Sequence, residues 1–170
     1  MLTATSSATA TLSSRFDSPV GELVALGDGS TLVGLYFGDS AQLAEGLNAH
    51  ADDEAFSVTR LWLDTYFAGG RPQAEPSIEL RGTPFQVAVW EQLRHIPHGT
   101  TCTYQDVATA IGRPSAVRAV AGAIGRNPIS IIVPCHRVIG SDGSLTGYGG
   151  GLDRKQRLLE VEQRLSTAPA

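Results

Sequence analysis

A cysteine and a histidine stand next to each other in the segment 134–137, which reads PCHR and follows the apolar run 129–133. A free thiol has a pKa of about 8.5, so it needs a basic partner or a positive field to supply a thiolate at neutral pH. His136 can be that base if the chain turns at Cys135, because adjacent residues of an extended chain point to opposite faces. The pattern indicates nucleophilic cysteine chemistry, with two ordinary packing residues as the alternative.

The spacing of apolar residues in the C-terminal segment places one carboxylate on a buried helix face, where it could orient His136. We expect a helix over 152–165, one stripe of which carries Leu158, Leu159, Glu162 and Leu165. Glu162 then faces the core, whereas Glu160 points away. Because a buried carboxylate needs a partner, we expect Glu162 to contact His136.

The other cysteine and histidines do not suggest a metal site. The two cysteines, Cys102 and Cys135, form no CxxC pair and have no zinc-like spacing to a histidine. So few cysteines favour a reducing, cytoplasmic compartment, and the sequence shows neither a signal peptide nor a membrane-spanning apolar run. We expect no metal, no cofactor, a packing role for Cys102, and exposed loop positions for His95 and His98.

The first half of the chain is predicted to form a small separate domain. Turn signals between short apolar runs predict an antiparallel hairpin or meander from Arg15 to Phe37. A helix is predicted over 58–67, and its apolar face is expected to carry Val58, Leu61, Trp62 and Tyr66. A proline-bearing connector at 71–82 follows. The predicted divisions are a disordered leader (1–14), an N-terminal α/β domain (15–80) and a C-terminal domain (81–170).

The second part is predicted to be mainly helical. Thr83 and Pro84 suit the N-cap and the first position of a helix. Two further helices, at 103–111 and 115–125, are joined by a Gly-Arg-Pro turn and make a helix-turn-helix candidate. The fold class is therefore α+β, with a small N-terminal antiparallel-sheet domain and a mainly helical, winged-helix-like C-terminal domain.

The formal net charge of −4 hides an uneven distribution along the chain. Residues 1–80 carry three basic and eleven acidic residues, whereas residues 81–170 carry ten basic and six acidic ones. The predicted helix 115–125 also presents a face of small residues and arginines, namely Ser115, Arg118, Ala119, Gly122 and Arg126. Small side chains let a helix approach a groove wall closely, which favours nucleic acid as a partner, and an ordinary solvated helix face is the alternative.

Four segments that contain these residues closely resemble the O6-alkylguanine-DNA alkyltransferase family. They read GTTCTYQDVA, RAVAGAIGRNP, IIVPCHRVIG and TGYGGGLDRKQRLLEVE. The resemblance is strong over residues 83–165, and residues 15–80 match the family's variable N-terminal domain more loosely.

The resemblance implies a DNA repair protein, a methylated-DNA–protein-cysteine S-methyltransferase that moves the alkyl group from O6 of guanine irreversibly to its own cysteine. By position, Cys135 resembles the acceptor, His136 the base that acts through a water, and Glu162 the residue that orients His136. Asn127 resembles the family's hinge asparagine, and Tyr104 resembles the donor of a proton to the leaving guanine.

The resemblance also implies that double-stranded DNA is bound through its minor groove and that the damaged nucleotide is flipped out. Arg118 would take the place of the flipped base, and the small-residue helix face and Tyr104 would contact the DNA. The substrate pocket would be formed by Pro134, Val138, Tyr148 and Gly149, with the backbone carbonyls of Cys135 and Val138 reading the guanine edge. Family members often carry Ser or Ala where this chain has Gly149, which predicts a more mobile loop. We expect a monomer without membrane contact, and leave cooperative assembly on DNA open.

Three other functions remain as alternatives. A non-catalytic lesion binder related to the alkyltransferases, or a helix-turn-helix regulator, would share the DNA-binding helices. Such lesion binders lack a cysteine at the reactive position, so Cys135 within an intact PCHRV motif favours the transferase. A cysteine hydrolase would use Cys135 and His136 but would not explain the helix that carries Arg118.

Overall fold

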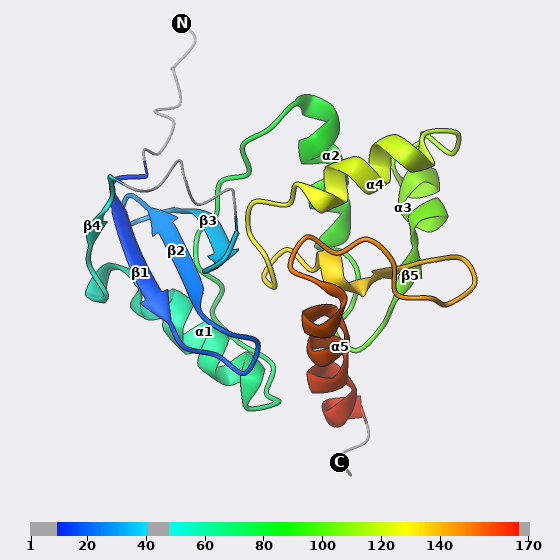
Figure 1. Cartoon of the computed structure of the whole chain (residues 1–170). Helices are drawn as coiled ribbons and strands as arrows, with labels where there is room; N and C mark the ends of the chain where they lie inside the picture. The colour runs from blue at the N-terminus through cyan, green and yellow to red at the C-terminus, as the bar shows by residue number, and fades with distance from the viewer. Residues whose placement is uncertain (1–9, 41–47, 167–170) are drawn as a thin grey trace, which may run out of the picture.

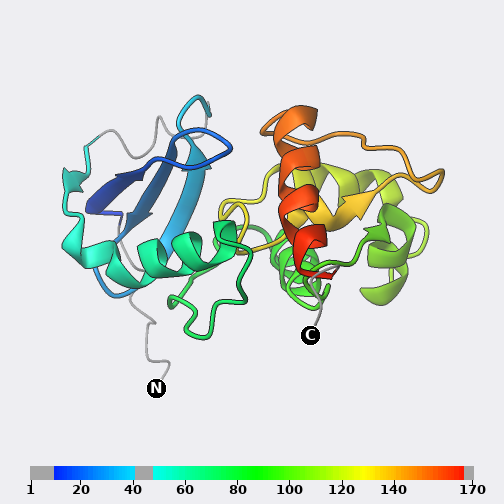
Figure 2. The same ribbon diagram turned by 90° about the horizontal axis from the view of Figure 1, so that it is seen from below.

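The computed structural model describes residues 10–40 and 48–166. It contains an N-terminal sheet with one helix and a mainly helical C-terminal part, and the two lie side by side (Figures 1 and 2). This is the α+β arrangement expected from the sequence. No helix of the described residues is long and apolar enough to cross a membrane.

The N-terminal sheet has four strands in the order β3-β2-β1-β4. Strands β1 (Leu12–Phe16), β2 (Leu23–Gly27) and β3 (Leu32–Phe37) pair antiparallel, as predicted, and the short β4 (His50–Ala51) adds parallel to β1. Because β1 begins at Leu12, the prediction of a disordered leader was wrong for residues 12–14, and residues 1–9 of it lie outside the described residues.

Strand β2 is buried on both faces, as its uninterrupted apolar sequence requires. Leu23 and Ala25 join the main core, whereas Val24 and Leu26 form a second, smaller cluster with Val33. The alternation follows from the period of two in a strand.

A short 3-10 turn, η2 (Glu54–Phe56), leads into α1 (Ser57–Phe67), which packs along the sheet (Figure 2). The helix was predicted, but its buried face is rotated from the prediction. Thr59, Leu63 and Tyr66 are buried, whereas Val58 and Leu61 are 47% and 62% exposed. Apolar residues on both sides of this helix made the face ambiguous in the sequence, and packing against the sheet selects one.

The C-terminal part begins with α2 (Pro84–Leu93), which starts with the predicted Thr83 N-cap and a proline in the first turn. Gln86 completes a capping box with Thr83. The helix-turn-helix consists of α3 (Tyr104–Ala110) and α4 (Val117–Gly125), which contact each other and α2. The indole nitrogen of Trp90 on α2 donates a 2.7 Å hydrogen bond to Ala123 O, which fixes α4 against α2.

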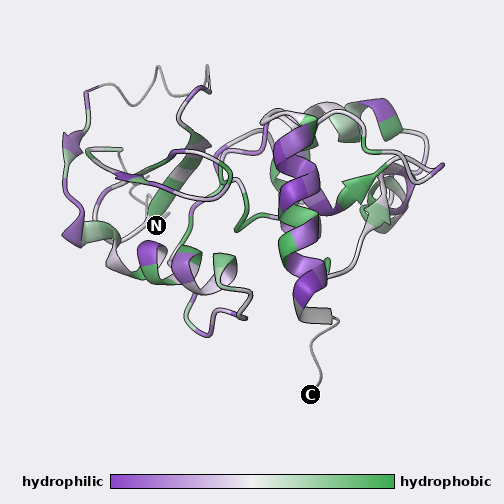
Figure 3. Ribbon diagram, turned by 60° about the horizontal axis from the view of Figure 1, so that its bottom comes forward, coloured by the Kyte–Doolittle hydropathy of each residue, from purple (hydrophilic) through white to green (hydrophobic). Residues whose placement is uncertain are grey.

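Two short strands, β5 (Cys102–Thr103) and β6 (Val138–Ile139), pair in parallel beside these helices. The last helix, α5 (Leu152–Ser166), is built mostly from hydrophilic residues (Figure 3). As the sequence predicted, it buries Leu158 and Glu162 and exposes Glu160, whereas Leu159 is half-buried and Val161 is buried in addition.

The two parts of the chain share one apolar core, which includes Phe37 of the sheet and Ile124 of α4. They are also joined by backbone hydrogen bonds from Leu35 N to Pro128 O (2.9 Å) and from Ser130 N to Leu35 O (2.9 Å). The run 129–133, expected to be extended, contains a turn, because Ile131 has a φ of 71° and Val133 N bonds to Ile129 O at 3.0 Å. The segment before Cys135 is therefore anchored to the N-terminal sheet.

Candidate active site

Cys135, His136 and Arg137 form a single 3-10 turn, η3, directly after Pro134. This turn meets the condition under which His136 could act as the base for Cys135. The three residues are 5%, 0% and 8% exposed, so a thiol, an imidazole and a guanidinium are buried together. Buried polar groups on this scale need partners from other elements.

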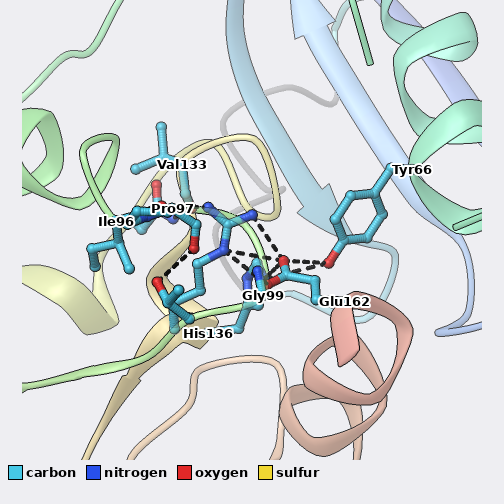
Figure 4. A network of polar contacts seen from close by, with 10 residues as sticks. Tyr66, Ile96, Pro97, Gly99, Val133, His136 and Glu162 are labelled. Atoms are coloured by element: carbon cyan, nitrogen blue, oxygen red, sulfur yellow. Dashed lines mark hydrogen bonds and ion pairs between the residues drawn. The ribbon is translucent and has the colours of Figure 1, made fainter. Parts of the chain in front are cut away.

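The predicted partner of His136 is in place, because its Nε2 lies 2.6 Å from Oε1 of Glu162. Glu162 is only 1% exposed and accepts several further hydrogen bonds, which Figure 4 shows meeting at its carboxylate. Arg137 donates from Nε to both oxygens (3.1 and 2.9 Å) and from Nη2 to Oε1 (2.9 Å). Tyr66 Oη donates to Oε1 at 2.9 Å, and Gly99 N donates to Oε2 at 3.2 Å.

These contacts set the charges of the network. Burial alone would raise the pKa of Glu162, but the hydrogen bonds from His136 and Arg137 hold that pKa well below its ordinary value. Burial lowers the pKa of His136 despite its bond to Glu162. The site therefore holds an ionised Glu162 next to a neutral His136. His136 Nδ1 has no hydrogen-bond partner in the described part of the chain.

Arg137 and Tyr66 were not among the predicted site residues. Arg137 also donates from Nη1 to Ile96 O at 2.7 Å, which ties Glu162 to the segment that follows α2. A sequence signal for Arg137 was available, because it is a charged residue that directly follows Cys135 and His136 in the otherwise apolar segment 131–139. The signal for Tyr66 was weaker, namely a hydroxyl on a residue expected in the core, where it needs a partner.

Cys135 lies at a pocket of about 510 Å³ between the sheet and the helical part. The pocket is lined by residues of both parts, including Phe37, Asp39, Ile124, Asn127, Ser130, Tyr148 and Arg154. Burial raises the pKa of the Cys135 thiol, and the effect is partly offset by Asn127, Tyr148 and the positive charge of Lys155. The resting group is therefore a thiol, which needs a base before it can act as a nucleophile.

Asn127 holds the turn that leads to Cys135. Its Nδ2 donates to Val133 O at 2.8 Å, and its Oδ1 accepts from Ile129 N at 3.0 Å. Both ends of the amide are thus used to close the segment between α4 and the cysteine. This geometry suits the hinge position that the resemblance implies for Asn127.

Two of the four residues expected in the substrate pocket line the pocket at Cys135. Tyr148 and Gly149 line the pocket. Pro134 lines a separate cavity of about 370 Å³, and Val138 is fully buried in β6. Neither residue is among those that line the pocket at Cys135. The part expected of Val138 is that of its backbone carbonyl, and this stays a prediction.

The glycine-rich loop before α5 is fitted closely to the N-terminal sheet. A Cβ on Gly150 would lie 2.5 Å from the Phe37 ring, whereas one on Gly149 would first meet Gly125 O at 3.4 Å. Gly150 is therefore required by packing, and Gly149 is not. Arg154 reinforces this contact, donating to Val20 O (2.9 Å), Asp39 Oδ1 (2.8 Å) and Gly150 O (3.1 Å).

Tyr104 is half-buried at the start of α3 and donates to Thr146 O at 2.8 Å. Lys155, which is fully buried, donates to the same carbonyl at 3.0 Å and lies 5.9 Å from the centre of the Tyr104 ring. Lys155 was missed, although it lies on the stripe of α5 that carries Leu158 and Glu162. A long amphipathic side chain at a core position is the signal that could have found it.

The predicted small-residue face of α4 is open to solvent. Ser115, Arg118, Ala119, Gly122 and Arg126 are all exposed. A Cβ on Gly122 would meet nothing within 4 Å, so the glycine is not required by the fold. The surface is therefore free to approach a groove.

His95 and His98 were expected at exposed loop positions, and Cys102 was expected to have a packing role. His95 is exposed, as predicted, but the prediction for His98 was wrong. The His98 ring lies edge-on to Tyr66 (5.8 Å between ring centres), and burial lowers its pKa. Cys102 is half-buried, and burial together with Asp106 raises its pKa to about 11, so it carries an unreactive thiol at neutral pH.

The described residues contain no group of three or more His, Cys, Asp or Glu side chains that could hold a metal ion.

Two family models match most of the chain. Residues 12–79 match the ribonuclease-like domain of 6-O-methylguanine DNA methyltransferase, and residues 84–164 match its DNA binding domain. A methylated-DNA–protein-cysteine methyltransferase of Mycobacterium tuberculosis is 48% identical over 154 residues, which cover 91% of this chain and 92% of that protein. One of Haemophilus influenzae is 45% identical over 152 residues, covering 87% and 84%.

A solved structure agrees with these sequence matches. The crystal structure of Mycobacterium tuberculosis OGT in complex with DNA superposes with a TM-score of 0.85 at 46% identity, and covers 94% of this chain and 96% of that one. With the fold, the PCHR turn and both family models in agreement, the chain belongs to the O6-methylguanine DNA methyltransferase family.

Proposed function

We propose that this DNA-repair methyltransferase removes the alkyl group from O6-alkylguanine in duplex DNA and transfers it irreversibly to Sγ of Cys135. The observation that carries the proposal is the position of the Cys135 thiol at a pocket of about 510 Å³, next to a buried His136–Glu162 pair. The DNA-binding family model supports the choice of partner.

The transfer is a displacement at the alkyl carbon. The bond between O6 and that carbon breaks as a new bond forms to Sγ, and the electron pair of the broken bond stays on the guanine. His136 takes the thiol proton through a water, and Nδ1 is its free nitrogen because Nε2 is bound to Glu162. The guanine recovers a proton from Tyr104, whose hydroxyl must leave Thr146 O to give it.

DNA is approached through the exposed face of α4. Its small residues, Ala119 and Gly122, let the helix enter the minor groove, and Arg118 fills the place of the flipped nucleotide. Flipping is required because the alkylated oxygen is out of reach inside the duplex. It costs a few kcal/mol of stacking, which Arg118 offsets in part.

The thioether formed at Cys135 has no ready leaving group. Each molecule therefore acts once. We propose that the protein does so as a monomer in the cytoplasm and without a cofactor.

Intact-mass spectrometry after incubation with an O6-methylguanine duplex tests this function. We expect the gain of one methyl mass per protein molecule, located on the peptide that holds Cys135. The Cys102→Ala variant should be labelled fully, and the Cys135→Ala variant not at all. Turnover beyond one equivalent would overturn the single-use mechanism, and binding of the duplex without any mass change would favour a lesion binder.

A further inference from the structure

Tyr66 reaches the active-site network from the other part of the chain. It lies on α1, outside the DNA-binding match at 84–164, and its side chain is fully buried. Its hydroxyl donates to Glu162 Oε1 at 2.9 Å and lies 3.4 Å from His136 Nε2 (Figure 4). A residue of the N-terminal domain therefore touches both members of the proposed base pair.

The Tyr66 ring is held on three sides. Trp62 stacks on it with 5.3 Å between ring centres and 9° between planes. Phe67 and His98 meet it edge-on, at 5.1 Å and 5.8 Å. Because packing fixes the ring, the hydroxyl position is set before any DNA binds.

The hydroxyl acts on the oxygen that matters to His136. Oε1 of Glu162 accepts from Tyr66, Arg137 and His136, and so its negative charge is shared among three donors. A carboxylate oxygen with fewer donors attracts a proton on His136 more strongly. Tyr66 thus weakens the pull of Glu162 on the imidazole without breaking the contact that orients it.

We propose that Tyr66 is a positioning residue for alkyl transfer, whose hydroxyl bond to Glu162 keeps His136 protonated on Nε2 only and leaves Nδ1 free to act as the base. The proposal rests on the proposed role of His136. It gives the N-terminal domain a part in the chemistry beyond supporting the fold.

The charged and titratable groups that face His136 come from several elements. Glu162 and Lys155 lie on α5, Arg137 is on η3 beside Cys135, and His98 follows α2. Arg71, after α1, acts on His98. The pKa of His136 is lowered and that of Cys135 is raised, so protonated His136 loses its proton before the thiol does as the pH rises. Below the pKa of His136 the base is blocked and the transfer rate falls. This fall at low pH, the acid limb of the rate profile, therefore reports the titration of His136.

The rate of methyl transfer to Cys135, followed by quenched mass spectrometry across the acid and neutral range, tests the proposal. Tyr66→Phe removes only the hydroxyl. We expect its acid limb to move to higher pH by about half a unit or more, with a rate near that of the parent protein above the limb. 3-Fluorotyrosine at position 66 is a stronger donor of nearly the same size, and should move the limb to lower pH.

Two control variants separate this role from packing and from His98. Phe67→Leu disturbs the same ring cluster but spares the hydroxyl, so it should lower Tm and leave the limb in place. His98→Gln removes the other nearby imidazole, and the shift caused by Tyr66→Phe should persist in that background.

The outcomes are distinct. A parent protein whose Cys135 gains no methyl group would contradict the proposed function itself. A parent protein that is methylated, with an acid limb that Tyr66→Phe and 3-fluorotyrosine leave unmoved or move in the same direction, would overturn only the role of Tyr66. A uniform loss of rate at every pH would show a purely structural role.

Discussion

His136 Nε2 and Glu162 Oε1 lie 2.6 Å apart, and both side chains are closed off from solvent. The same carboxylate carries the hydrogen bonds of Arg137, so one buried charge orients the proposed base and also neutralises a buried guanidinium. Stability and chemistry are therefore coupled at Glu162.

Replacement of Glu162 by Gln is expected to destabilise the fold by about 3 kcal/mol at neutral pH, because Arg137 is left buried without a countercharge. The pKa of Glu162 is depressed in the folded state, so its contribution is fully present above its ordinary pKa of 4.5 and is lost as the pH falls below that value. Urea unfolding at a series of pH values measures this. The gap between the two proteins should narrow in acid, and a gap that stayed constant would show that the charge of Glu162 is not responsible.

Arg118→Ala is expected to weaken binding of an alkylated duplex and to reduce the salt dependence of binding by about one unit of slope. Repair of the duplex should slow, while reaction with free O6-benzylguanine, which needs no base flipping, stays nearly unchanged. Arg60→Ala removes an exposed arginine from α1 of the N-terminal domain and serves as the control. Equal losses with duplex and free base would contradict the proposed place of Arg118 in the base stack.

Gly150→Ala is expected to slow alkyl transfer, because the new Cβ would lie 2.5 Å from the Phe37 ring and push the loop off the sheet. Gly149→Ala is the matched control, since its Cβ would meet its nearest neighbour, Gly125 O, at 3.4 Å. Transfer rates and Tm of both variants measure the difference. If Gly149→Ala transferred the alkyl group more slowly than Gly150→Ala, the requirement for a glycine at position 150 would be contradicted.

Arg154→Ala is expected to raise the rate with benzyl relative to methyl substrates, because the guanidinium lies 4.6 Å over the Phe37 ring and binds Gly150 O on one wall of the pocket. Asp39→Asn removes the charge of the exposed ion-pair partner and keeps the other Arg154 bonds, so it should leave this ratio unchanged. Competition between the two substrates gives the ratio directly. If Asp39→Asn altered it as much as Arg154→Ala, the ion pair and not the loop contact would control selectivity.

The sequence located much of the candidate site because its signals are local. A joint role of the adjacent Cys135 and His136 depended on a turn after Pro134, and the structure has one at 135–137. The period of α5 put Glu162 on the buried face, from which it reaches His136. The small-residue face of α4 followed from helical spacing in the same way.

Local sequence patterns could not predict contacts between distant segments of the chain. Tyr66 is 96 positions from Glu162, and Arg154 is 134 from Val20, so no periodicity links either pair. The rotated face of α1, the strand at residues 12–14 and the burial of His98 are also products of packing between elements.

By itself, the sequence determined the existence of the α-helices α1 to α5 and the identity of the adjacent thiol and imidazole that could react, since both depend on neighbours within a few positions. Only the tertiary structure decided which side chains share the carboxylate of Glu162 and which N-terminal residues line the pocket at Cys135. The reason is that a buried charge is stabilised by whichever donors folding brings to it, and here those donors come from α1, η3 and the segment after α2.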